Sequence, residues 1–358
     1  MKITVIAAKE LTSELVLRWS QIQRTNPNLA NPNFHPEFTQ TVAAVRNDVE
    51  VGVMEEGGEP VGFFPFQRSR WNVAMPVGGR FSDYQAVILR EGVEWEPEQL
   101  VRGCGLRAWR FDHLIASLEE CTRYHLLIDD SPYMDLSGGF EAYEAAQAEA
   151  GSKLIRRVAQ RTRKIERDIG PLRFVPHTTE QAVFEKLIEW KSNQYRETDT
   201  TNPFSHRWTV ELLERIRLRR DESFGGVLSA LYAGERLVAA HLGMHSYGVL
   251  HGWFPAYDRE LSRYSPGLIQ FIELARAAES LGVRLIDLGK GLSRYKRELM
   301  SGTFKVAEGS VDLRPVTRLL RSGFRSACDW GRSSPLRGPA RIPARVLRHF
   351  SEWLALRQ

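Results

Sequence analysis

The stretch that decides the fold runs 226-GVLSALYAGERLVAAHLGMHSYGVLHGWFPAYDRELSRYSPGLIQFIELARAAESLGVRLIDLGKGLSRYKRELMSGTF-304. Three apolar runs stand close together in it: Gly226 to Tyr232, Arg236 to His245, and Val249 to Ala256. The gaps Ala233-Gly234-Glu235 and Ser246-Tyr247-Gly248 each contain a glycine, which gives the backbone the freedom that a tight hairpin needs. The stretch therefore predicts a three-stranded antiparallel meander.

A helix, a strand and a second helix are predicted after the meander. Ser265-Pro266-Gly267 begins the first helix, because serine is a good N-cap and proline suits the first helical position. An apolar stripe at helical spacing follows, and the helix ends near Gly282. The run from Val283 to Leu288 predicts a short buried strand, and Gly289-Lys290-Gly291 leads into the second helix. This order makes an α+β unit with one parallel crossover.

The order of these elements resembles the core of the GNAT acyltransferases. In that family acyl-CoA lies where the fourth and fifth strands splay apart, and its pyrophosphate sits on the helix after strand four. The physical reason is general, because unpaired N–H groups and the helix dipole favour an anion at a helix N-terminus. The usual phosphate loop reads Arg/Gln-x-x-Gly-x-Gly/Ala, and the stretch from Arg263 to Leu268 departs from it.

Three short motifs resemble a narrower group, the CelD-type acetyltransferases, which are close relatives of the FemAB peptidyltransferases. These motifs are Ser265-Pro266-Gly267, the strand end Asp287-Leu288-Gly289, and Tyr295-Lys296. The resemblance covers about residues 1–312 and is strongest over 225–305. It implies two GNAT-like domains in tandem.

The predicted fold class is α+β, with two tandem GNAT-like domains joined by a long helix and followed by a basic helical tail. We expect a degenerate GNAT-like domain over 1–138, a linking basic amphipathic helix over 139–171, and the acyltransferase domain over 172–312. The tail covers 313–358. The first domain is expected to be degenerate because no Ser-Pro-Gly loop precedes its helix at Glu96 and no Tyr-Lys pair follows.

The positive charge of the chain is concentrated in the tail. The net charge is +5, but residues 313–358 contain ten arginines, no lysine and two acids, which gives +8. The preceding 312 residues therefore carry −3, so the overall basicity does not indicate nucleic-acid binding. Residues 313–326 and 342–357 each place apolar side chains opposite arginines at helical spacing. Such segments suit an anionic membrane surface, and the alternative is that they dock on the rest of the chain.

The remaining composition indicates a globular protein in the cytoplasm, with a peripheral position on the inner face of the membrane if the tail binds lipid. Hydrophobic residues make up 42% and charged residues 26% of the chain. The three cysteines have neither metal-binding spacing nor an even-numbered disulfide pattern. No run of about 18 apolar residues occurs, and the first residues read as a strand rather than a signal peptide.

Three residues are candidates for the chemistry of acyl transfer. His241 lies on one strand face with small neighbours and could act as a base. Asp287 ends a buried strand, where side chains tend to face a ligand crevice. The FemAB resemblance implies that Lys296 stabilises the oxyanion or an acceptor phosphate. The alternatives are a hydrogen-bonded core histidine, a loop cap and a surface lysine. His245 and His251 lie near His241, but no carboxylate or cysteine completes a metal site, so no metal is expected.

The resemblance also implies where acyl-CoA and the acceptor bind. The expected donor-binding residues are Phe254, Ala256, Arg263, Ser265, Gly267 and Leu268. The expected acceptor-binding residues are Asp83, Tyr84, Arg161, Tyr257 and Tyr295. Pro255 supports a splay at this place, because proline cannot donate to a strand ladder and fits at an edge or a bulge.

The function implied by the resemblance is N-acyl transfer from acetyl-CoA or another acyl-CoA to an amino group, on an amino sugar of a cell-surface polysaccharide or its precursor. One alternative is a FemAB-like transferase that uses charged tRNA, although no inserted coiled-coil arm is apparent. The other is a non-catalytic subunit of a polysaccharide-synthesis complex. Outside the tRNA alternative, no nucleic acid is expected as a partner.

Overall fold

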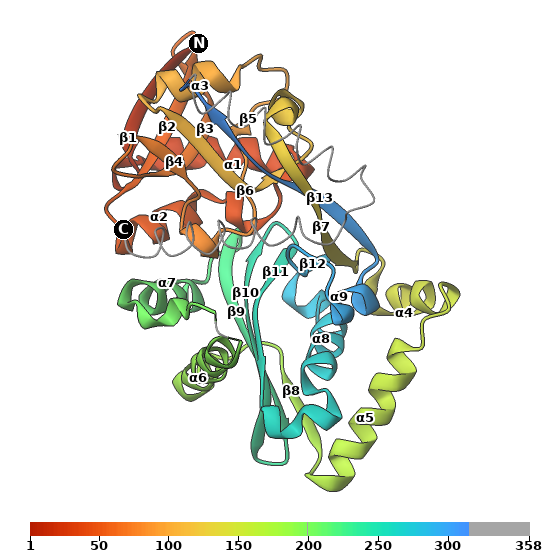
Figure 1. Ribbon diagram of the computed structural model, residues 1–358. Coiled ribbons are helices and arrows are strands. Elements are labelled where there is room, and N and C mark those ends of the chain that lie inside the picture. The colour runs from red at the N-terminus through yellow and green to blue at the C-terminus, as the bar shows by residue number, and fades with distance from the viewer. Residues whose placement is uncertain (199, 315–358) are drawn as a thin grey trace, which may run out of the picture. The chain divides into compact units, whose positions relative to one another are not determined.

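The computed structural model describes residues 1–198 and 200–314 and has an α+β fold (Figure 1). By its contacts the chain divides into two compact units. Among the described residues, the first unit contains 1–26, 42–128 and 306–314, and the second unit contains 27–41 and 129–305 except residue 199. The units are therefore interleaved along the sequence. The boundaries predicted at 138, 171 and 312 stay a prediction, and nearly all of the predicted tail lies outside the described residues.

The first unit is built on a mostly antiparallel sheet. Its strand order is β1-β2-β3-β4-β6-β13, with β5 paired to β3 and a parallel pair between β4 and β6. Phe64, Phe66 and Trp109 lie in its buried core. The elements are β1 (Lys2–Ala7), α1 (Ser13–Thr25), α2 (Pro36–Val45, which starts in the second unit), β2 (Val49–Glu56), β3 (Glu59–Arg68), β4 (Val73–Met75), β5 (Ile88–Leu89), α3 (Pro97–Gly103), β6 (Ala108–Ile115) and β13 (Gly302–Asp312, which starts in the second unit).

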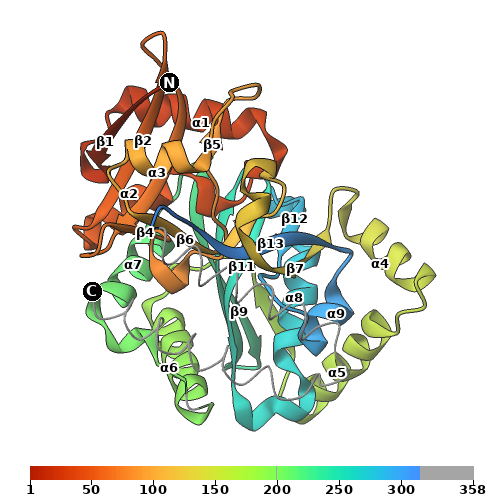
Figure 2. The same ribbon diagram turned by 45° about the horizontal axis from the view of Figure 1, so that its top comes forward.

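The second unit is built on a sheet with the order β7-β12-β11-β10-β9-β8. Helix α8 covers one face of its central strands, whereas α6 and α7 lie on the other face (Figures 1 and 2). The elements are β7 (His125–Asp135, which starts in the first unit), α4 (Gly139–Glu149), α5 (Leu154–Asp168), β8 (Leu172–Val175), α6 (Gln181–Glu197), α7 (Arg207–Leu218), β9 (Phe224–Ala233), β10 (Arg236–Ser246), β11 (Val249–Tyr257), α8 (Pro266–Arg276), β12 (Leu285–Asp287) and α9 (Arg294–Leu299).

The predicted meander and crossover are confirmed. Strand β10 pairs antiparallel with both β9 and β11, and β11 pairs parallel with β12. The hairpin turns fall at Gly234 and Gly248, whose φ angles of 57° and 84° lie in the left-handed region that glycine adopts without strain.

The predicted helix after the meander is α8, and Pro266 is its first residue. The glycines in the turns and the proline at the helix start are therefore sufficient to predict the secondary structure of this stretch.

Two predicted elements differ in the structure. The single long helix expected from Gly139 to Ile169 is wrong, because the chain forms α4 and α5 with a break between them. Gly151 in the break has a φ of 75°, which ends a right-handed helix. The sequence from Thr303 to Leu313 predicts a closing hairpin around Gly309, but the structure has the single strand β13 there, which pairs along β6. Among the described residues, no helix is both long and apolar enough to cross a membrane.

Candidate acyl-transfer site

Strands β11 and β12 separate after only three paired positions. The parallel register runs from Val249 with Leu285 to His251 with Asp287, where β12 ends, while β11 continues to Tyr257. Between its two registers with β10, β11 carries one extra residue, which makes a β-bulge at this point. A Cβ atom on Gly252, in the bulge, would lie 2.9 Å from the carbonyl oxygen of Asp287. The bulge and glycine thus mark the point where the two strands part.

The start of α8 offers backbone groups to an anion. Ser265 precedes the helix with a φ of 54°, and its carbonyl oxygen accepts from the amides of Leu268 and Ile269. The expected side-chain cap is absent, because the Ser265 hydroxyl does not bond the first turn. Pro266 has no N–H, so Gly267 supplies the amide of that turn that has no intrahelical acceptor. A Cβ atom on Gly267 would lie 3.3 Å from Cδ1 of Tyr257, so any larger residue here would crowd the Tyr257 ring at the end of β11.

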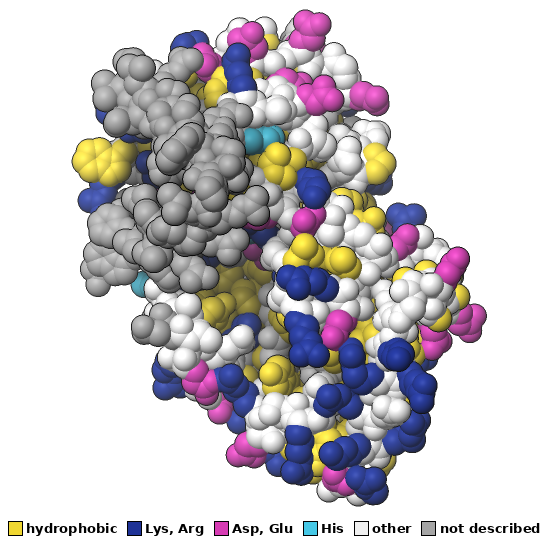
Figure 3. Space-filling model, turned by 45° about the vertical axis from the view of Figure 1, so that its right-hand side comes forward, with side chains coloured by type: hydrophobic (Ala, Val, Ile, Leu, Met, Phe, Trp, Pro, Cys, Tyr) yellow, Lys and Arg dark blue, Asp and Glu magenta, His cyan; other side chains and the backbone are white. Residues whose placement is uncertain are grey.

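Basic side chains from α5 approach the same loop. The Arg161 guanidinium donates to the carbonyl oxygen of Arg263 at 2.5 Å, and Lys164 lies 5.8 Å from the ring centre of Tyr264. Figure 3 shows Lys and Arg side chains gathered over the lower part of the face that it presents. The exposed basic side chains of α5 and the residue before it are Lys153, Arg156, Arg163, Lys164 and Arg167. The structure therefore brings predicted Arg161 and Arg263 together at the start of α8.

Asp287 is the centre of a buried polar cluster in the second unit. Its side chain accepts from His251 Nδ1 at 2.6 Å, from the Asn31 amide at 3.0 Å and from the backbone N–H of Gly289 at 3.0 Å. Because a carboxylate can only accept, the ring nitrogen of His251 is the donor. Both Asp287 and His251 are fully buried. Asp287 thus holds the end of β12 and the following turn, rather than facing solvent.

Lys296 also bonds to the glycine turn that follows β12. Its Nζ atom donates to the carbonyl oxygens of Gly289 and Lys290, at 2.9 and 3.0 Å. The Nζ atom of Lys290 in turn lies 3.2 Å from a carboxylate oxygen of Asp129. The Lys296 ammonium group therefore donates two hydrogen bonds to backbone carbonyl oxygens. Asp287 and Lys296 together determine the shape of the turn that leads from β12 into α9.

His241 lies inside the protein, under α8. Its ring centre is 5.6 Å from that of Phe271, and neither ring nitrogen has a hydrogen-bond partner among the described residues. Burial, and secondly the neighbouring His251, lowers the pKa of His241 to about 3. A Cβ atom on Gly243 would lie 2.9 Å from the His241 ring. The space left by that glycine is therefore taken up by the imidazole, and the residue is neutral at physiological pH.

The burial of His241 predicts a pH-dependent stability. Its pKa is about 3 in the folded protein and 6.5 when exposed, so between these values the unfolded chain binds a proton that the folded chain does not. The free energy of unfolding should therefore decrease as the pH falls from 6.5, with a limiting slope of about 1.4 kcal/mol per pH unit from this group.

The measurement is urea unfolding at several pH values between 4 and 8 for the parent and His241→Leu. The variant should show the shallower decrease below pH 6.5, and His35, whose pKa burial also lowers to about 3, should keep part of the slope. Equal slopes in the two proteins would contradict the neutral, buried state of His241.

The other predicted site residues belong partly to the second unit and partly to the first. In the second unit, Phe254 and Ala256 are buried on β11, Tyr257 is 38% exposed, and Leu268 is half-buried. Tyr295 stacks on Phe271 with centroids 6.0 Å apart, and burial raises the pKa of its hydroxyl to about 12. In the first unit, Tyr84 is buried and an Asp83 oxygen lies 3.9 Å from His113 Nε2. Within the described residues, no group of three potential metal ligands occurs.

Sequence reasoning missed two partners of Asp287. Asn31 reaches it from 256 positions earlier in the chain, and nothing in the local pattern around Asn31 indicates that contact. His251 stood out in the sequence, but only as a weak candidate for a metal ligand. The parallel register that places it opposite Asp287 would have indicated the pair.

Comparisons with known proteins agree on the fold. FemX matches with a TM-score of 0.54 and 8% identity over 90% of this chain and 99% of that chain. A tandem GNAT protein from the clavulanic acid biosynthesis pathway matches at 0.50, with 11% identity over 88% and 99%. The L-PGS of Bacillus licheniformis matches at 0.51, with 12% identity over 87% and 96%. No curated protein matches this chain. At such identities the likeness concerns the fold alone.

A protein-family comparison matches part of the sequence. Residues 152–297 match the family described as acetyltransferase (GNAT) domain. This range runs from just before α5 to the middle of α9, and so includes the meander, the splayed strands and the start of α8. The predicted recognition is confirmed: residues 152–297 of this chain match the acetyltransferase (GNAT) domain family.

Proposed function

We propose that the second unit binds acyl-CoA at the start of α8 and transfers its acyl group to an amino group of an amino sugar, in a cell-surface polysaccharide or its precursor. The observation that carries the proposal is the splay of β11 from β12 beside a helix that begins with Pro266-Gly267. A GNAT domain implies an acyl-CoA donor. Arg161 and Arg263, at the start of α8, supply the positive charge that suits its phosphates.

The residues around the splay have distinct roles in this proposal. The acceptor nitrogen attacks the thioester carbon, the C–S bond breaks, and the CoA sulfur leaves as the nitrogen loses a proton. Backbone N–H groups freed where β11 leaves β12 are suited to the developing oxyanion. Asp287 and Lys296 act as positioning residues, because they hold the glycine turn and are already bonded to protein atoms. Water accepts the proton, since His241 is buried and its pKa is low.

The first unit is assigned a supporting role. We regard it as a degenerate GNAT-like half, in line with the FemX and tandem GNAT likeness over most of the chain. Asp83 and Tyr84 are the groups that we assign to acceptor binding there. The enzyme acts in the cytoplasm in this proposal, where acyl-CoA is available.

The test is ligand binding by the full chain, read by thermal shift and isothermal calorimetry. Acetyl-CoA and longer acyl-CoAs should raise the melting temperature. At a ligand concentration of a hundred times the Kd, the free energy of unfolding should increase by about 2.7 kcal/mol. Charged tRNA and the same tRNA without its amino acid form the second arm. If the chain bound charged tRNA but not acyl-CoA, the function would be aminoacyl transfer from tRNA instead of acyl transfer from CoA. Binding of neither donor would favour the non-catalytic subunit.

A further inference from the structure

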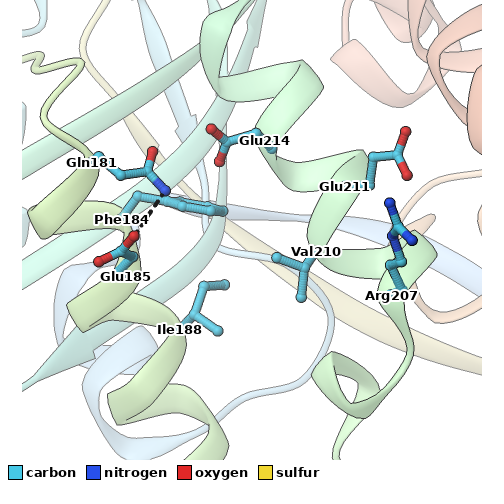
Figure 4. Close-up of a pocket in the computed structure, with 8 residues that line it drawn as sticks. All are labelled: Gln181, Phe184, Glu185, Ile188, Arg207, Val210, Glu211 and Glu214. Carbon is cyan, nitrogen blue, oxygen red and sulfur yellow. Dashed lines mark hydrogen bonds between the residues drawn. The ribbon is translucent and has the colours of Figure 1, made fainter.

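Helices α6 and α7 enclose an open groove of about 650 Å³ on the second unit (Figure 4). Its apolar lining is formed by Phe184 and Ile188 of α6 and by Val210 of α7. Phe184 is buried, whereas Ile188 and Val210 are half-buried and accessible from outside. An apolar partner that covered Ile188 and Val210 would gain about 25 cal/mol for each Å² of apolar surface removed from water.

Carboxylates line this groove. Glu211 and Glu214 of α7 are paired with Arg215 and Arg217, at 2.8 and 2.6 Å. Glu185 of α6 accepts only the Gln181 amide, at 3.2 Å, and no described cation lies within ion-pair distance of it. Among the described residues that line the groove, Arg207 is the single cation, and Glu185 is the carboxylate that has no ion pair. The groove therefore has the surface chemistry that fits a segment both apolar and basic.

We propose that this groove binds residues 342–357 of the same chain. That segment, which lies outside the described residues, combines the two properties that the groove calls for. Its sequence places Arg345, Arg348 and Arg357 opposite an apolar set at helical spacing. The apolar set is Val346, Leu347, Phe350, Trp353 and Leu354. Aromatic side chains of this kind are the usual anchors of an amphipathic segment in an apolar groove.

Covalent attachment favours this occupant over a second copy of the chain. The described part ends at Arg314, and 27 residues connect it to residue 342. Any chain of 27 residues reaches about 90 Å when fully extended, and a random coil of that length has an end-to-end distance of about 30 Å. A tether of this length gives an effective concentration on the order of 1 mM. Even weak complementarity would then keep the groove occupied in dilute solution.

Docking and membrane binding would use the same apolar and basic side chains of residues 342–357. The two states therefore exclude each other, and anionic lipid would compete with Glu185 and the apolar lining for the segment. The groove acts as an internal receptor that shields the basic segment when no lipid surface is present.

The experiment uses the full chain with the photo-crosslinker p-benzoylphenylalanine in place of Ile188, and in a second protein in place of Val210. Mass spectrometry should locate the crosslinks in residues 342–357 of the same chain, at a yield that does not change on tenfold dilution. The control protein carries the crosslinker at Glu189, which is exposed on α6 and does not line the groove. It should give at least fivefold less of this product.

Charge variants in the crosslinking protein test the contribution of Glu185. Glu185→Lys should lower the yield at least threefold at low salt, whereas Glu189→Lys, the matched control, should leave it within twofold. Anionic vesicles containing phosphatidylglycerol should lower the yield, and neutral phosphatidylcholine vesicles should not.

Three outcomes would overturn the proposal. The first is crosslinks from both groove positions that fall outside residues 342–357. The second is a product between two chains that grows with concentration, which would assign the groove to a second copy. The third is no crosslink together with binding to anionic vesicles, which would assign the segment to membranes alone.

Discussion

Replacing Gly267 with aspartate is expected to weaken acyl-CoA binding by about 30-fold relative to asparagine at the same position. Both side chains crowd Tyr257 equally, because a Cβ atom there already lies 3.3 Å from its ring. Only aspartate adds a negative charge in the first turn of α8, where we place the pyrophosphate. A like charge several ångströms from the phosphates, at an effective dielectric constant near 20, costs about 2 kcal/mol, which corresponds to this factor.

Calorimetric titration of acetyl-CoA into the parent, Gly267→Asn and Gly267→Asp measures the effect. The aspartate variant should remain folded, because an acid in the first turn interacts favourably with the helix dipole. A melting temperature equal to or above that of the asparagine variant would confirm that folding is intact. Equal affinities of the two variants would place the phosphates elsewhere and leave the GNAT fold assignment untouched.

Replacing Asp287 with asparagine is expected to lower the free energy of unfolding by about 3 kcal/mol. The Asp287 carboxylate receives hydrogen bonds from His251, Asn31 and the amide of Gly289, all within 3.0 Å. An asparagine can accept through one oxygen only, so its own NH₂ group would face a donor of the cluster. Leaving buried partners of a charged group unsatisfied costs several kcal/mol. We also expect turnover to fall, because the glycine turn between β12 and α9 loses its anchor.

Urea unfolding gives the stability, and turnover is measured well below the unfolding transition so that the two effects separate. Asp129→Asn is the matched control, because Asp129 pairs with Lys290 beside the same turn and is partly exposed. Its loss should cost less than about 1 kcal/mol. An Asp287→Asn protein with parental stability and turnover would show that the buried cluster supports neither the fold nor the site.

Much of the second unit could be predicted from the sequence because its signals are local. Glycines at 234 and 248 set the hairpin turns, and Pro266 sets the start of α8. These features depend on φ angles and missing N–H groups, which each residue carries with it. The GNAT resemblance rested on the same stretch, and the family match over 152–297 confirms it. The break at Gly151 was also local, since its φ lies in the left-handed region, and the amphipathic pattern that predicted the helix belongs to α5, after the break.

What the sequence determined by itself is therefore the order of elements in the second unit, the GNAT domain match over residues 152–297 and the place where the phosphates are expected to bind. Only the tertiary structure decided the state of the candidate side chains. In the folded chain His241 is buried under α8. Asp287 accepts a hydrogen bond from Asn31, which lies 256 positions away in the sequence. Lys296 donates to carbonyl oxygens of the glycine turn. The reason is physical: backbone conformation follows from neighbouring residues, whereas burial and hydrogen-bond partners depend on segments distant in the sequence.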